Sequence, residues 1–93
     1  MMGPRVLTPD ELKALPRLAI VFIECFDGEY NEPIDFMMAG MKTYDDAIVD
    51  EDGSFYGPNF EKDMGRSSFD GSMFRFWNMK PTEDQRKAVP WNG

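Results

Sequence analysis

The sequence predicts an α+β domain built on a small curved antiparallel sheet of three to five strands, with a short capped helix near each end. Two segments, one near each end of the chain, carry the same helix-start pattern. Short β-branched or alternating segments lie between them. The 93 residues, 42% hydrophobic and 14% aromatic, suit one domain spanning 1–93. Closure of the sheet into a barrel-like form is left open as an alternative.

The first helix is expected to begin after Thr8, which can cap it, with Pro9 at the first helical position and Glu11 completing a capping box. Pro16 disfavours helical geometry in the residue before it, so this helix should end near Ala14.

The last helix repeats this pattern near the C-terminus. Thr82 is its expected cap and Gln85 the third helical residue, with acidic residues in the first turn and basic residues in the last. Pro90 should stop it.

The strands are expected between these helices. Residues 17–26 are nearly all apolar and predict a strand buried on both faces. Residues 34–44 predict a second strand, in which Gly40 suggests a bulge or bend. A hairpin around Asp52-Gly53 and a last strand at 72–79 follow. Residues 57–71 have no hydrophobic period and predict an irregular loop.

The net charge of −7 is distributed unevenly. Residues 27–63 hold eleven acidic against two basic residues, which disfavours direct nucleic-acid binding because such a surface repels phosphate. Solvated hairpin tips explain this segment, and a surface that imitates nucleic-acid phosphates is the alternative. The candidate acidic face consists of Asp45, Asp46, Asp50 and Asp52.

The same aspartates do not predict a metal site. Counted from Gly53 as the sixth position, an EF-hand loop would begin at Ile48 and end at Asn59, neither of which fits the pattern. One cysteine and no histidine also argue against zinc. No metal and no cofactor are therefore expected.

Nothing in the sequence indicates an enzyme. The chain has no histidine to activate a serine or a cysteine, and it has no glycine-rich phosphate loop. Glu24 is the one carboxylate expected to be semi-buried, in an ion pair with Arg75. A catalytic interpretation would need a deep pocket holding such a carboxylate with a perturbed pKa.

The C-terminal aromatic segment offers a candidate interaction surface, since tryptophan and arginine are enriched at interface hot spots. The alternative is that these side chains close a small core, with Arg75 anchored across a neighbouring strand. The candidate residues are Phe74, Arg75, Trp77 and Trp91.

The segment DGSMFRFWNMKPTEDQRKAVPW, with LTPDELKALP and VFIE near the start, resembles small uncharacterised phage and prophage proteins of gut Firmicutes. Their tails read roughly Tyr-Gly-x-x-Trp-Arg-x-Trp-x-x-x-Pro-Thr-x-x-Gln-Arg and often end in Trp. The matching residues are Gly71, Arg75, Trp77, Pro81, Thr82, Gln85, Arg86 and Trp91. Asp70 and Phe74 depart from the pattern. The resemblance implies a phage origin and no reaction.

The expected function is that of a non-enzymatic, phage-derived accessory protein acting through contacts with an unknown protein partner, with a homo-oligomer left open. The alternative is an acidic inhibitor of a host DNA-binding protein; a small enzyme or a metal-binding protein is the least favoured interpretation. The opening residues hold no apolar segment typical of a signal peptide, and no apolar run is long enough to span a membrane, so a cytoplasmic location in a bacterial host cell is expected.

Overall fold

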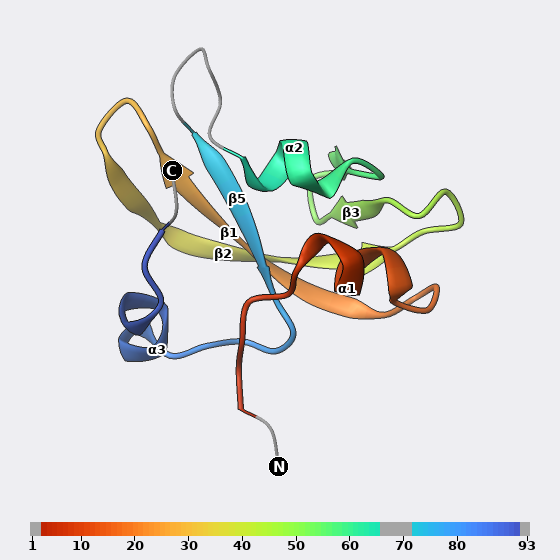
Figure 1. Cartoon of the computed structure of the whole chain (residues 1–93), viewed down its shortest axis with the longest axis horizontal. Coiled ribbons are helices and arrows are strands. Elements are labelled where there is room, and N and C mark those ends of the chain that lie inside the picture. The colour runs from red at the N-terminus through yellow and green to blue at the C-terminus, as the bar shows by residue number, and fades with distance from the viewer. Residues whose placement is uncertain (1–2, 66–71, 92–93) are drawn as a thin grey trace.

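The computed structural model describes residues 3–65 and 72–91, with the backbone alone at residues 35 and 36. It confirms an α+β fold with a small antiparallel sheet and short helices (Figure 1). In chain order the elements are α1 (Pro9–Ala14), β1 (Ile20–Asp27), β2 (Glu32–Lys42), β3 (Ile48–Asp50), β4 (Phe55–Tyr56), α2 (Phe60–Met64), β5 (Met73–Trp77) and α3 (Glu83–Ala88).

The five strands lie in the order β4-β3-β2-β1-β5, each antiparallel to its neighbours. Val6 adds an isolated bridge to Trp77 on the outer side of β5. The sheet is open, so the barrel-like alternative was wrong. Closure would require the two edge strands, β4 and β5, to pair with each other. β4 is only two residues long, and the N-terminal segment covers part of the free edge of β5.

Both predicted capping boxes are confirmed. In α1 the Thr8 hydroxyl accepts a hydrogen bond from the Glu11 amide while the Glu11 carboxylate accepts one from the Thr8 amide. Thr82 and Gln85 make the same reciprocal pair in α3.

The segment 57–71 differs from the predicted irregular loop because it contains α2. Asn59 caps this helix by accepting a hydrogen bond from the Lys62 amide. Phe60 is fully buried and packs edge-on against Phe76 of β5, with ring centroids 5.8 Å apart. One buried ring thus orders a segment that shows no hydrophobic period; residues 66–71 lie outside the described residues.

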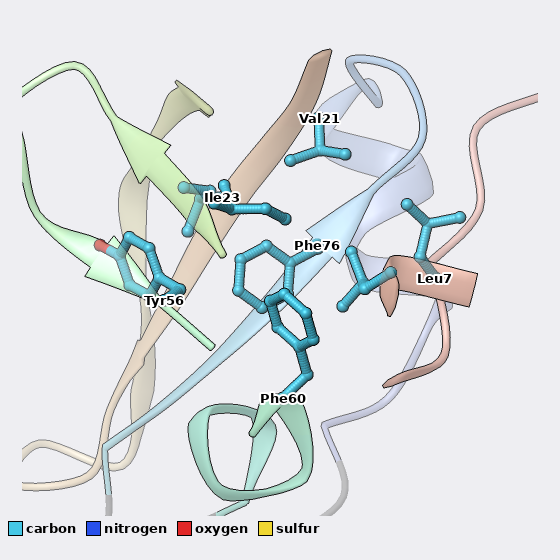
Figure 2. Close-up of a cluster of buried hydrophobic side chains, with 8 residues drawn as sticks. Leu7, Val21, Ile23, Tyr56, Phe60 and Phe76 are labelled. Atoms are coloured by element: carbon cyan, nitrogen blue, oxygen red, sulfur yellow. The ribbon is translucent and has the colours of Figure 1, made fainter. Parts of the chain in front are cut away.

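The core lies on the inner face of the sheet, which α1 and α2 cover (Figure 2). The aromatic rings of Tyr56, Phe60 and Phe76 meet there at edge-to-face angles, the geometry that aromatic quadrupoles favour. The buried members of the core cluster are Leu7, Leu12, Val21, Ile23, Ile48, Tyr56, Phe60 and Phe76.

Lys42 points into this inner face and is 1% exposed. Its ammonium donates to three backbone carbonyls at the end of α1, those of Leu12 at 2.6 Å, Lys13 at 2.9 Å and Leu15 at 3.2 Å. A cation at this end also complements the partial negative charge of the helix C-terminus. Lys42 therefore ties α1 to β2.

No bulge lies at Gly40, so this part of the prediction was wrong. It pairs in register with Val21 and Asp50, whereas the register shift between β1 and β2 falls between Glu24 and Phe26, where residues 34–36 of β2 oppose a single residue of β1. A Cβ at residue 40 would lie 2.6 Å from Ile48 Cγ2. Glycine is needed here for close packing.

Candidate functional site

The outer face of the sheet divides into a half covered by α3 and a half that no described helix covers. Cross-strand partners share a face, so the registers assign each side chain to one half. α3 and the residues that follow it lie over β1 and β5. The two halves have different chemistry.

Glu24 is the centre of the covered half. It lies directly opposite Arg75 in the sheet, and its side chain is 1% exposed. One carboxylate oxygen accepts from Arg75 Nε at 2.5 Å and from Trp77 Nε1 at 2.8 Å; the other accepts from Arg86 Nε at 2.8 Å. The predicted Glu24–Arg75 ion pair is confirmed, whereas Arg86 and Trp77 were not predicted as partners.

Arg75 connects this carboxylate to the end of α3. Its two terminal nitrogens donate to the carbonyls of Val89 at 2.8 Å and Arg86 at 2.9 Å. Its guanidinium also lies 4.0 Å from the centre of the Trp91 ring, within the range of a cation–π contact. Since no residue of α3 is itself buried, these polar contacts and Trp91 hold the helix on the sheet.

The pKa of Glu24 follows from these contacts. Burial raises it, but the hydrogen bonds from Arg75, Arg86 and Trp77 outweigh burial and hold it below the ordinary value. Glu24 is therefore an ionised carboxylate saturated with donors, which makes it a poor proton donor and a weak base. These contacts join β1, β5 and α3.

A groove of about 380 Å³ lies beside this network, between α3 and the start of β2. Its walls include Glu24, Pro33, Arg86 and Trp91. The charged groups in the wall are already paired with one another. The indole nitrogen of Trp91 is buried without a hydrogen-bond partner among the described residues. Glu24 thus lines this groove as a buried carboxylate with a shifted pKa, but the shift is downward and both of its oxygens already accept hydrogen bonds.

The four candidate interaction residues do not form one surface. Trp77 is 0% exposed and Arg75 is buried, so neither can contact a partner. Phe74 lies on the opposite face of the sheet and packs against Tyr56, with ring centroids 5.1 Å apart. Trp91 is half-buried against Phe26. The four side chains are buried or half-buried, as the alternative interpretation, closure of a small core, expects.

The candidate acidic face also loses a member. Asp50 is buried, and its carboxylate accepts from the Tyr56 hydroxyl at 2.7 Å and from the amides of Asp52 and Ser54. Burial raises the pKa of Asp50, but these hydrogen bonds hold it below the ordinary value. Asp45, Asp46 and Asp52 are exposed, and Asp46 lies 3.9 Å from the Lys42 ammonium. Asp50 thus orders the β3–β4 turn.

The uncovered half carries a line of apolar side chains across four strands, which we term the outer row. Ile20 pairs with Met41, Met41 with Val49, and Val49 with Phe55, so all four share the outer face. Phe55 is 68% exposed, Ile20 52% and Met41 37%, whereas Val49 is half-buried. Sequence reasoning missed this row. Only the strand register aligns the four residues, although each stands at an alternating position of its segment.

The outer row is poor in charge compared with its surroundings. Phe22 and Ala39, the next cross-strand pair on this face, are half-buried and apolar. The exposed Glu51 lies beside them, and its carboxylate accepts a hydrogen bond from the Ala39 amide. Contiguous exposed apolar surface on a small protein is often a contact site.

No family model, curated protein sequence or solved structure matches this chain. Of the helices in the described part of the chain, none has the length and apolar character needed to cross a bilayer.

Proposed function

We propose that this chain is a non-enzymatic, phage-derived accessory protein that acts through contacts with another protein in the cytoplasm of a bacterial host cell. The observation that supports the proposal is the outer row, where Ile20, Met41 and Phe55 are exposed on one sheet face, with the half-buried Val49 between Met41 and Phe55. Covering these side chains would remove apolar area from water, which is the main driving force of protein association.

The resemblance to phage and prophage proteins supports the proposed origin. Its matching residues include Arg75, Trp77 and Arg86, which bind Glu24, together with Thr82 and Gln85, which cap α3. The shared pattern therefore marks residues that hold the fold together. A partner surface is better sought elsewhere, and the outer row lies outside the pattern.

The acidic-inhibitor alternative has weaker support. It rested on the acidic segment 27–63, with four aspartates near β3 as its candidate face, and the carboxylate of one of these, Asp50, is engaged in internal hydrogen bonds. The remaining three lie on two separate turns, at residues 45–46 and at residue 52. Rows of carboxylates at phosphate spacing would be needed for mimicry.

Site-specific photo-crosslinking in bacterial host cells tests the proposal. Benzoylphenylalanine replaces Phe55 in one variant and Tyr30 in the control, because both residues are 68% exposed aromatics and Tyr30 lies in the distant β1–β2 turn. A discrete adduct is expected from position 55 alone, and it should disappear when Met41→Gln is added. An adduct of twice the chain mass would identify a second copy of the chain. No adduct, or equal adducts from both positions, would contradict the proposal.

A further inference from the structure

The charges beside the outer row indicate which partner chemistry fits it. The β2–β3 connection, which carries the exposed Asp45 and Asp46, adjoins the start of β3. The β3–β4 turn, which carries the exposed Glu51 and Asp52, adjoins its end. The part of the row on β3 is thus flanked by carboxylates on both sides.

Two basic side chains, Lys42 and Arg17, lie at the end of these flanks formed by the β2–β3 connection. Lys42, the nearest lysine in the sequence, is buried on the inner face with its ammonium bound to the end of α1, and the Asp46 carboxylate lies 3.9 Å from that ammonium. Arg17 is exposed at this end of the sheet and lies over the ring of Tyr44, 3.5 Å from its centroid. Asp46 is therefore paired, whereas the exposed Asp45, Glu51 and Asp52 outnumber the exposed Arg17, in a chain whose net charge is −7.

From these observations we propose that the occupant of the outer row is an amphipathic helix whose apolar stripe is flanked by lysine or arginine. This inference rests on the proposed function, because it names the partner of the same surface. The apolar stripe would cover Ile20, Met41 and Phe55, while the basic flanks would face the acidic turns.

A helix is the element that this sheet already accepts elsewhere. α1 and α2 cover the inner face, and α3 covers the other half of the outer face. Neighbouring strands are about 4.8 Å apart, so a row across four strands spans roughly 14 Å. Three turns of helix span about 16 Å, which is enough to place three apolar anchors along the row.

A second copy of the chain fits this surface less well. Stacking two outer rows would bring the acidic turns of one copy near those of the other, and the assembly would carry twice the net charge of −7. Charges within about 8 Å are only partly screened at physiological ionic strength. Like charges across an interface oppose association, whereas basic flanks favour it.

Methyl NMR titration of the whole chain tests the inference. The probe is a synthetic helical peptide with leucine at helical spacing and lysine on both flanks; the control peptide replaces each lysine with glutamate. The lysine peptide should shift the methyl resonances of Ile20, Met41 and Val49, and its affinity should fall as salt is added. The glutamate peptide should not bind.

Two matched variants separate the outer row from general attraction to an acidic protein. Met41→Gln should weaken binding of the lysine peptide roughly tenfold, as expected for loss of a central apolar anchor. Met79→Gln should leave it unchanged, because Met79 is a similarly exposed methionine, 42% against 37%, that lies beyond β5 and outside the row. Amide spectra of both variants check that the fold is retained.

Each other result overturns the inference. Equal binding of both peptides would show that charge does not select the partner. Binding that is unchanged by Met41→Gln would show that the peptide binds outside the outer row. Sedimentation that shows a dimer dissociated by Met41→Gln would assign the row to a second copy. A crosslinked partner at position 55 in cells, without any binding of the lysine peptide, would overturn this inference and leave the proposed function standing.

Discussion

Glu24 on β1 and Arg75 on β5 are direct cross-strand partners, and Arg75 Nε lies 2.5 Å from Glu24 Oε1 in the interior of the protein. Both side chains are almost fully removed from solvent. The carboxylate also holds Arg86, so two guanidinium groups depend on one buried anion. The stability of the fold should therefore depend on this carboxylate.

Replacing Glu24 with its neutral isostere tests how much the carboxylate contributes to stability. Glu24→Gln leaves the guanidinium of Arg75 buried without a counter-ion, and the free energy of unfolding should fall by about 3–5 kcal/mol. Urea denaturation followed by tryptophan fluorescence measures the loss. Glu83→Gln removes an exposed carboxylate paired with Lys87 and should change stability by less than about 0.5 kcal/mol. Equal effects of the two substitutions would refute the central role of Glu24.

The stability of the chain should also depend on Glu24 in acid. The pKa of Glu24 is lower in the folded protein than its ordinary value of 4.5, so the unfolded state takes up the proton first as the pH falls. The stabilisation is fully present above about pH 4.5 and is lost as the pH drops through the folded pKa. The urea concentrations at half-unfolding of the wild type and of Glu24→Gln should therefore converge as the pH falls through the folded pKa of Glu24. A constant difference from neutral to acidic pH would contradict the assignment.

Arg86 should control the docking of α3 more than the stability of the sheet. Its side chain joins the helix to Glu24 and to the Ile34 carbonyl, which accepts from its terminal nitrogen at 2.8 Å. Arg86→Met should speed amide hydrogen exchange in α3 by at least about tenfold and change β1 and β5 much less. Lys87→Met, an exposed neighbour on the same helix, provides the control. Uniform acceleration across the sheet would show that α3 does not open separately.

Lys42 is expected to contribute to stability, because its side chain, unusually for a lysine, is buried. Lys42→Met keeps the apolar stem but leaves the carbonyls of Leu12, Lys13 and Leu15 without their cationic donor. We expect a loss of about 2–3 kcal/mol in the free energy of unfolding. Thermal denaturation measures it, with the exposed Lys62→Met as the matched control. A lysine whose removal is neutral would mean that water replaces the ammonium at the end of α1.

The packing role of Gly40 leads to a fifth expectation. The new methyl group of Gly40→Ala would lie 2.6 Å from Ile48 Cγ2 and 2.9 Å from Ile23 Cδ1, both in the core. Overpacking of this kind costs about 1–3 kcal/mol. Gly3→Ala has open space around the added atom and should be neutral. If Gly40→Ala were also neutral by chemical denaturation, Ile48 and Ile23 would have room to move.

Sequence patterns predicted the local structure well because the relevant contacts are short in range. The Thr8 and Thr82 capping boxes each involve residues three positions apart, and both helices begin where the pattern placed them. Alternation likewise located β5. α2 was missed because its order depends on Phe60 reaching Phe76, a contact that no local period reveals.

The candidate sites were harder to predict because side-chain exposure depends on the whole fold. Trp77 and Arg75 have the composition of an interface, yet the docking of α3 and the segment after it places them inside. Asp50 reads as one more surface aspartate until Tyr56 is brought against it by the β3–β4 turn. Residue type alone cannot distinguish these outcomes.

By itself, the sequence determined the class of fold, the two capped helices and the acidic middle segment, and it suggested a pairing of Glu24 with Arg75 that the β1–β5 register then formed. Only the tertiary structure decided that the sheet stays open, that Arg86 reaches Glu24 across 62 positions, and that Ile20, Met41, Val49 and Phe55 line up on one face. The physical reason is range. Caps and alternation arise from neighbours along the chain, whereas burial, buried ion pairs and exposed rows arise from strand register and helix docking, which join residues far apart in sequence.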